Sequence, residues 1–423
     1  MKAVITNAVP LNTGDAAILR ATVAILRRAF ADLDVVVYGE QPETASALYP
    51  EMAFRRSLYA QLDEWAGGRR RKLAALALLL VAWASRFDFG RRRLLPMLPP
   101  RLRASLEEYR AADVVVSSGG TYLVPHYRLM PKLFDFLVTL ALGRPLVLFT
   151  QSLGPFGGFG RRWILRLILS RATLILVRDE RSAGHLRGLG VPSDRVRVCA
   201  DAAFALSNRA AAAPRRAPAS NGLRIAVSVR DWPHFTNLRS QQGMAQFADA
   251  MVALVQMLVE KFGADVTFLS TCQGIPEYWT DDSRLARAIE ERLTGAARSR
   301  VRVDARFHDP EALRDRYAGY DVVIATRMHA AILALCAGTP VMPLAYEFKT
   351  AELFGRLGFA GMVPSIEGVD GATLCSAFRQ VLLRWQVCGD EIWGKVAVEE
   401  RASLAASEHV RAALAPASMP APA

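Results

Sequence analysis

The sequence predicts an α/β protein with two doubly wound parallel sheets that face a cleft. Three observations support this. The 423 residues, 52% of them hydrophobic, exceed what one hydrophobic core holds. Short β-branched runs alternate with longer helical patterns, as is typical of parallel sheets buried on both faces. An Ala/Pro/Arg-rich stretch over residues 207–222, which has no periodicity, divides this pattern into two series.

The first series defines an N-terminal domain over residues 1–206. Its strand-like runs are Ala3–Thr6, Val35–Tyr38, Val114–Ser117, Leu146–Phe149 and Leu174–Val177. The second series defines a C-terminal domain over residues 223–385. Its runs are Ile225–Val229, Val266–Leu269, Val322–Ala325 and Val341–Leu344.

Helical patterns lie between the strands and after them. They include Asp15–Phe30, Met130–Leu142, Gln241–Phe262 and Asp309–Tyr317. We expect a further helical segment over residues 386–414, then a disordered Ala- and Pro-containing tail over 415–423. The carboxyl ends of the strands in such domains are the expected ligand site.

Residues 55–103 form a basic, apolar insertion in the first domain. This stretch holds twelve basic and three acidic residues, or +9 of the chain's net charge of +13. Within it, Leu73–Phe87 is apolar between two arginine-rich runs, but it is shorter than the roughly twenty residues of a membrane-spanning helix. It is therefore either a buried helix or lid, or a helix resting on anionic lipid, with a true span the remaining alternative. No module for nucleic-acid binding accompanies the charge, so we expect no nucleic-acid partner.

The five cysteines form no CxxC pair, and no His, Asp or Glu cluster has metal-ligand spacing. We therefore expect a reducing compartment, the cytoplasm, with no metal and no cofactor. The N-terminus enters a strand directly, so we expect no signal peptide.

In the first domain, candidate ligand contacts follow predicted strands. Asn12, Gly14 and Asp15 open the first helix, where the alternative is simple helix capping. Gly119 and Gly120 allow close approach of a ligand to the backbone, and the alternative is a tight turn. The remaining candidates in this domain are Gln151 and Arg178, each at the end of a further predicted strand. Asp179, beside Arg178, is expected to cap the next helix.

In the second domain, charged residues end three strands. Arg230 directs a guanidinium fork at the predicted cleft, where it suits a phosphate or carboxylate, and the alternative is a structural salt bridge. Arg327 and His329 lie between a strand and a helix of small residues, and the imidazole is titratable near neutral pH. Glu347 and Lys349 follow the next strand and add a carboxylate and an ammonium.

With these residues in view, the chain resembles the polysaccharide pyruvyl transferase family over about residues 2–385. The resemblance rests on the order of NTGDAAIL from Asn12, SGG from Ser118, QSLGPF from Gln151, RDERS from Arg178 and DAAFAL from Asp201. It continues in SVR ending at Arg230, STCQG from Ser270, RMHAAILALCAGTPV from Arg327 and YEFK from Tyr346. Ser118 and Met328 stand where the family often has Gly and Leu, and neither departure removes a charge.

The resemblance implies a GT-B-like fold of two Rossmann-like domains and a ketal-forming transfer. The donor would be phosphoenolpyruvate, and the acceptor a sugar of a cell-surface glycan or of a lipid-linked saccharide precursor. We expect the protein itself in the cytoplasm, in association with the inner face of the plasma membrane. Arg230 and Arg327 match donor-binding arginines, and His329 matches the proposed acid. Lys349 and Arg178 are weaker anion contacts.

Two other functions remain open at this point. A GT-B glycosyltransferase would use a nucleotide-sugar, with Glu347 as the candidate that holds the ribose. A catalytically silent scaffold in a glycan assembly complex is the third alternative. The acceptor sugar, the linkage and the oligomeric state are outside what the sequence indicates.

Overall fold

The computed structural model describes residues 1–124, 128–209, 222–235 and 239–415. These fall into two compact units. Unit 1 consists of Met1–Pro10, Ile18–Ala202 and Ala402–Ala423, and unit 2 consists of Leu11–Ala17 and Ala203–Arg401. Most of the predicted 207–222 linker, and nearly all of the predicted 415–423 tail, lie outside the described residues.

Unit 1 is built on a parallel sheet with the order β3-β2-β1-β4-β6-β7-β8, and β5 pairs with β6. Its strands are β1 (Lys2–Thr6), β2 (Asp34–Gly39), β3 (Ala53–Arg56), β4 (Val114–Ser117), β5 (Gly120–Leu123), β6 (Leu146–Leu153), β7 (Leu174–Val177) and β8 (Val196–Val198). The five predicted strands are present. The sequence did not indicate β3 and β8, which are short edge strands with exposed positions, nor β5, which starts inside the glycine turn.

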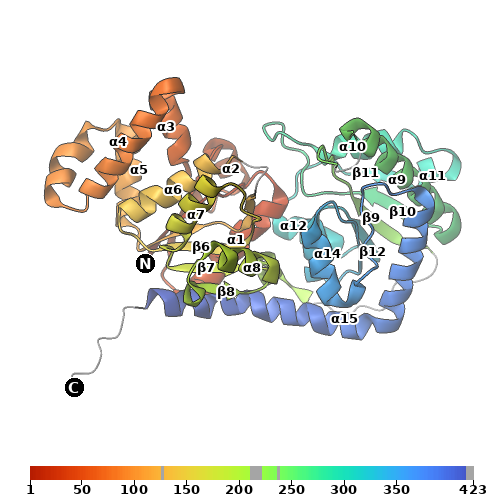
Figure 1. The fold of residues 1–423 in the computed structure, drawn as a ribbon. Helices are drawn as coiled ribbons and strands as arrows, with labels where there is room; N and C mark the ends of the chain where they lie inside the picture. The colour runs from red at the N-terminus through yellow and green to blue at the C-terminus, as the bar shows by residue number, and fades with distance from the viewer. Residues whose placement is uncertain (125–127, 210–221, 236–238, 416–423) are drawn as a thin grey trace, which may run out of the picture. The chain divides into compact units, whose positions relative to one another are not determined.

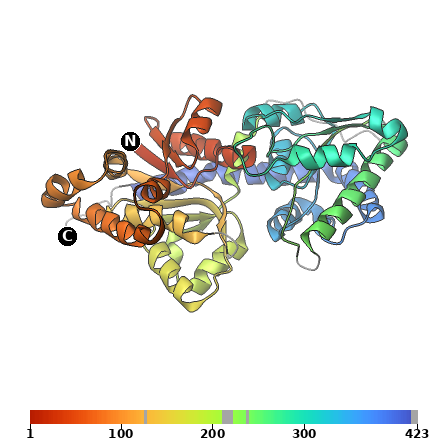
Figure 2. The ribbon, with the colours of Figure 1, turned by 90° about the horizontal axis from the view of Figure 1, so that it is seen from above.

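Helices separate these strands. They are α1 (Thr13–Ala29), α2 (Pro42–Leu48), α3 (Leu58–Ala66), α4 (Arg71–Ala84), α5 (Pro100–Ala111), α6 (Leu129–Ala141), α7 (Phe159–Leu169) and α8 (Glu180–Leu189). In both ribbon views the orange helices α3 and α4 lie beyond the sheet at one end of unit 1 (Figures 1 and 2). The basic insertion is therefore a helical addition to the sheet.

Helix α4 explains the apolar segment Leu73–Phe87. One stripe, Ala74, Leu78 and Ala82, is buried in a core shared with Leu58 of α3 and Phe134 of α6. The opposite side stays exposed, so the predicted buried helix is buried along one stripe only. Among the described residues, no helix is long and apolar enough to cross a membrane.

Unit 2 is built on a five-stranded parallel sheet with the order β11-β10-β9-β12-β13. Its strands are β9 (Arg224–Ser228), β10 (Asp265–Phe268), β11 (Val301–Val303), β12 (Val322–Ala325) and β13 (Val341–Pro343). Its helices are α9 (Ser240–Phe262), α10 (Asp282–Glu290), α11 (Gly295–Ser299), α12 (Pro310–Tyr317), α13 (Met328–Cys336), α14 (Phe348–Phe354) and the first part of α15 (Gly371–Leu414). Because Ser228 pairs with Ala325, the loops after β9 and β12 leave the sheet at the same level.

The helix predicted over 386–414 is the later part of α15. This helix already begins at Gly371 and is interrupted at Cys388, where φ is −119°. The interruption lies beside Gly389, and no proline separates the two parts. Trp385, 2% exposed, anchors the earlier part because its Nε1 donates a hydrogen bond of 2.9 Å to the Val341 carbonyl.

Candidate functional site

The candidate site of unit 2 lies at the carboxyl edge of its sheet. Loops after β9, β10, β12 and β13 carry Arg230, Cys272, Arg327 and Tyr346. The buried Cys272 thiol lies within electrostatic reach of Arg327, Asp282, Asp15 and Arg230, although burial dominates and raises the pKa of this thiol to about 12. Groups predicted from separate motifs are therefore brought together here.

The loop with Asn12 and Gly14 belongs to this unit. Thr13 N donates to the Thr271 carbonyl at 2.9 Å, and Thr13 Oγ1 donates to the His308 carbonyl at 2.8 Å. The Asn12 side chain accepts a hydrogen bond of 2.9 Å from Gly14 N, which stabilises the turn into α1. A Cβ atom at Gly14 would lie 2.9 Å from His329 Cβ, so only glycine allows this approach.

Arg327 is held by a carboxylate that the sequence did not single out as a site residue. Its Nε and Nη2 donate to the two oxygens of Asp282 at 2.9 and 2.6 Å, and the two side chains are 7% and 0% exposed. Ser270 Oγ donates a further hydrogen bond of 2.6 Å to Asp282. Burial is the largest single influence and lowers the pKa of Arg327, but the charge and hydrogen bonds of Asp282, together with Cys272 and Tyr346, raise it further, so the net direction is upward. The guanidinium is thus a fixed cation in a preset orientation.

Arg230 is held by aromatic rings. Its Cζ lies 4.1 Å from the Tyr346 ring centroid and 4.8 Å from that of Trp232, within cation–π range. Its buried Nε has no hydrogen-bond partner among the described residues. The rings orient the guanidinium without consuming this donor, which suits a group that receives an anion.

Glu347 and Lys349 form an ion pair at the start of α14. Lys349 Nζ lies 2.7 Å from Glu347 Oε2, and the side chains are 13% and 17% exposed. Lys349 also lies 5.6 Å from the Tyr346 ring centroid, which places the pair beside Arg230. Much of the Lys349 charge is balanced by Glu347, so Arg230 is the stronger anion receptor of the two.

His329 lies in the first turn of α13, a helix whose other residues are buried. Its partial exposure and its contact with Gly14 place it at the margin of the site rather than inside the core. Imidazole at this position is suited to proton transfer with a bound molecule.

The predicted contacts in unit 1 form a separate, buried network. A Cβ atom at Gly119 would lie 2.5 Å from Thr150 Oγ1, so this glycine is required by packing. Gly120 has a φ of 155°, which favours glycine. Gln151 Nε2 donates to the Ser118 carbonyl at 2.6 Å, while its buried Oε1 has no partner among the described residues.

Arg178 is also tied into unit 1. All three guanidinium nitrogens are engaged: Nε donates to Ser152 Oγ at 2.8 Å, Nη1 pairs with Asp201, and Nη2 donates to Thr121 Oγ1 at 2.7 Å. Asp179 caps α8 through Ser182 N at 2.6 Å, which confirms the predicted cap. These contacts give Arg178 a structural ion pair. A pocket that it shares with Arg230 stays a prediction, since the structure describes each unit by itself.

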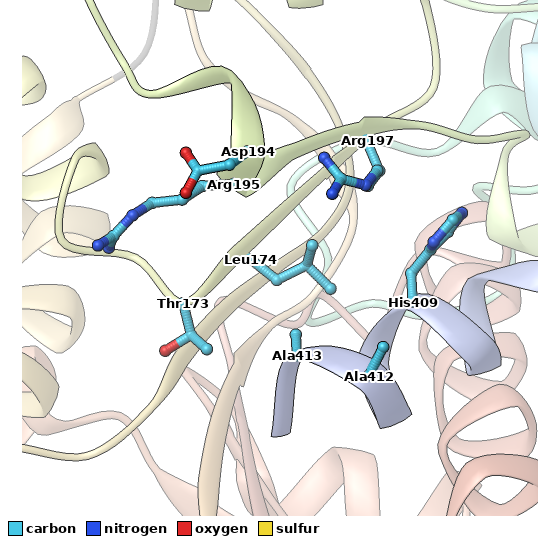
Figure 3. Close-up of a pocket in the computed structure, with 8 residues that line it drawn as sticks. All are labelled: Thr173, Leu174, Asp194, Arg195, Arg197, His409, Ala412 and Ala413. Carbon is cyan, nitrogen blue, oxygen red and sulfur yellow. The ribbon is translucent and has the colours of Figure 1, made fainter. Parts of the chain in front are cut away.

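A pocket of about 520 Å³ in unit 1 contains none of the predicted site residues. It is lined by Thr173, Leu174, Asp194, Arg195, Arg197, His409, Ala412 and Ala413. Figure 3 shows Arg197 and His409 on one side and Asp194 and Arg195 on the other, with no common point at which the charges converge. No group of His, Cys, Asp and Glu with the geometry of a metal site occurs among the described residues.

Sequence reasoning missed the partners of the arginines. Asp282, Trp232 and the ring of Tyr346 determine how Arg327 and Arg230 are held. The Asp281-Asp282 pair was the one available signal, but nothing local indicated that the second of these carboxylates is buried against Arg327.

Comparison with known proteins gives concordant results. A family model described as polysaccharide pyruvyl transferase matches residues 12–347. The amylovoran biosynthesis protein AmsJ of Erwinia amylovora is 26% identical over 383 residues, covering 88% of this chain and 89% of AmsJ.

Solved structures with the same fold have much lower identity. A glycosyltransferase from Rickettsia africae has a TM-score of 0.60 at 9% identity, covering 99% of each chain. The UDP-GlcNAc 2-epimerase of Neisseria meningitidis, bound to UDP-GlcNAc, has a TM-score of 0.55 at 12% identity, covering 98% of this chain and 99% of its own. Anabaena HepE in complex with UDP-glucose has a TM-score of 0.53 at 11% identity, covering 97% of this chain and 98% of its own. These similarities and the two parallel sheets confirm the GT-B-like α/β fold class.

Proposed function

Because the chain belongs to the polysaccharide pyruvyl transferase family, we propose that it transfers a pyruvyl group from phosphoenolpyruvate to a sugar of a cell-surface glycan or its precursor. The product is a ketal, and phosphate is released. The relative AmsJ is named for amylovoran biosynthesis, which supports a role in making a polysaccharide. We place the reaction in the cytoplasm and assign it no cofactor.

The observation that carries this proposal is the set of contacts that Arg230 makes. Its guanidinium lies against two aromatic rings, and its buried Nε has no hydrogen-bond partner among the described residues. A phosphate or carboxylate is the natural partner of such a group. Arg327 adds a second cation. Asp282 occupies its Nε and Nη2, which leaves Nη1 as the guanidinium nitrogen with no hydrogen bond in the part of the chain that the structure describes.

The reaction forms two new C–O bonds at C2, the carbon of phosphoenolpyruvate that bears the phosphate ester. A proton reaches the methylene carbon, a sugar hydroxyl attacks C2, and the methylene becomes the methyl group of the product. A second hydroxyl then attacks the same C2, and the C2–O bond to phosphate breaks. The two sugar hydroxyls lose two protons in total. One proton is gained by the methylene carbon, and the other is taken up by the leaving phosphate. We assign the protonation to His329, which lies two residues after Arg327 in the first turn of α13 and close to Gly14.

The decisive measurement is phosphate release from phosphoenolpyruvate by the purified full chain, with candidate glycans or lipid-linked saccharides as acceptors. We expect acceptor-dependent release and a product whose mass increases by that of a pyruvyl ketal. Arg230→Ala should raise the KM for phosphoenolpyruvate by at least about tenfold, since a charged hydrogen bond is worth roughly 1.5–3 kcal/mol. The matched control is Arg302→Ala, an exposed arginine on β11.

Sugar transfer from UDP- or GDP-sugars without any pyruvyl transfer would contradict this proposal. The protein would then be a glycosyltransferase, with Glu347 as the residue that holds the ribose. An inactive chain that still assembles with glycan-synthesis proteins would favour the scaffold.

A further inference from the structure

Helix α4 carries a second apolar stripe that the protein core does not cover. Its members recur at spacings of three and four residues on the side opposite the buried stripe of Ala74, Leu78 and Ala82. They are Leu73, Leu76, Leu80 and Trp83 of α4 and Phe87 in the turn after the helix ends at Ala84, with 71%, 59%, 66%, 52% and 57% of their surface exposed. We call these five residues the α4 surface. The Trp83 and Phe87 rings contact each other edge to face, with centroids 5.5 Å apart, so its aromatic end is continuous.

Exposed basic residues border the α4 surface at both ends. Arg69, Arg70 and Lys72 lie at the start of α4, and Arg86 and 91–93 follow it. The acidic residues nearby are already paired: Asp63 with Arg71 at 2.8 Å, and Asp88 with Arg91 at 2.6 Å. The border is therefore strongly positive around an apolar centre.

We propose that the α4 surface docks unit 1 on a bilayer that contains anionic lipid. Leucines with a Trp–Phe pair match the acyl and interfacial layers, and flanking Lys and Arg match anionic headgroups. The positive charge favours anionic lipid over a second copy of this chain as the binding partner. In a dimer formed through the α4 surface, the basic borders of the two copies would repel each other. The helix lies in the interface plane instead of crossing it, since its buried stripe stays packed on α3 and α6.

The docking is independent of the proposed reaction and concerns a different part of the chain. It would place an enzyme of glycan assembly at the surface where lipid-linked saccharides reside. Its test uses no substrate, so failure of pyruvyl transfer and failure of docking are separate results.

Vesicle co-sedimentation of the full chain tests the proposal. We expect binding to phosphatidylcholine vesicles with 30% phosphatidylglycerol, about tenfold or more weaker binding to pure phosphatidylcholine, and loss of binding as salt rises from 0.05 to 0.5 M. Brominated lipid should quench tryptophan fluorescence, and Trp83→Phe should remove most of that quenching.

Two matched pairs of variants locate the contact. Lys72→Gln, Arg92→Gln and Arg93→Gln together should weaken binding by about 100-fold, at roughly fivefold per charge. The control triple Arg287→Gln, Arg302→Gln and Arg379→Gln removes equal charge from exposed positions of unit 2 and should weaken it far less. Leu76→Ser with Leu80→Ser should weaken binding by at least about tenfold. Trp279→Ser, at an exposed apolar position of unit 2, should not.

The substitutions lie on exposed positions, so melting temperatures should stay within a few degrees of the wild type. The proposal is overturned by absent binding to anionic vesicles at 0.05 M salt, or by α4 variants that bind like their controls. It is also overturned if light scattering shows a dimer that the α4 variants abolish while vesicle binding is absent, because the occupant is then a second copy.

Discussion

Asp282 is the carboxylate on which the orientation of Arg327 depends. The pair is buried, and Ser270 Oγ donates to the same Oδ2 of Asp282 that accepts from Arg327 Nε. A buried charge without its partner costs several kcal/mol, whereas replacing both charges by apolar groups is often neutral for stability. Stability and donor binding can therefore be separated at this pair.

We expect Asp282→Asn to lower the free energy of unfolding by about 3–5 kcal/mol, because the Arg327 charge stays buried. The double change Asp282→Leu with Arg327→Met should recover most of that loss in urea denaturation but not the activity. A stable Asp282→Asn variant with an unchanged KM for phosphoenolpyruvate would contradict the positioning role. So would a double variant with full turnover.

His329 is the residue on which the proposed mechanism depends most directly. If it supplies a proton, His329→Ala should reduce single-turnover transfer by roughly 10²–10⁴-fold, with a much smaller change in donor affinity. Arg327→Lys should restore little, since an ammonium does not reproduce a guanidinium held by two hydrogen bonds.

His409→Ala in unit 1 is the matched control for this histidine and should keep normal turnover. Melting temperature is measured on the same preparations. A folded His329→Ala protein with near-normal turnover ends the assignment of His329 as the acid and leaves it as part of the contact with Gly14.

At the scale of the element, α6 is tied to the sheet of unit 1 through a buried acid. Asp135, 2% exposed, accepts hydrogen bonds from Thr6 Oγ1 of β1 and from Tyr109 OH of α5, the latter at 3.2 Å. Burial raises the pKa of Asp135 to about 6, and the two hydrogen bonds offset only part of that effect. This helix therefore contributes a pH dependence to the stability of unit 1.

The sign follows from the raised pKa in the folded state. The protonated acid is favoured by folding, so this contribution is fully present below pH 4 and is lost as pH rises through about 6. It amounts to about 3 kcal/mol in total and about 1 kcal/mol between pH 5 and pH 8. Asp135→Asn should flatten the difference in unfolding free energy between these two pH values, measured by urea denaturation. A wild-type curve parallel to that of the variant would show that Asp135 does not titrate there.

At the scale of the whole molecule, two helices are divided between the units. The first turn of α1 belongs to unit 2 through Thr13 and Gly14, while the rest belongs to unit 1. Helix α15 is divided between Arg401 and Ala402. The boundaries near residues 206 and 386 stay a prediction from periodicity, which indicates where helices run and not which core their residues contact.

The sequence by itself determined the α/β class, the two series of strands, the motifs that end them and the resemblance to the family. These properties are local, since periodicity, turn residues and strand ends are encoded within a few residues. The tertiary structure alone decided that Arg327 pairs with Asp282, that Arg230 rests on Tyr346, that Gly14 lies against His329, and that α4 has one buried and one exposed stripe. The partners in each of these contacts are remote in the chain. The residues next to an arginine in the sequence do not indicate whether its guanidinium pairs with a carboxylate or packs on an aromatic ring. Which one does depends on the packing of the strands and helices that carry them.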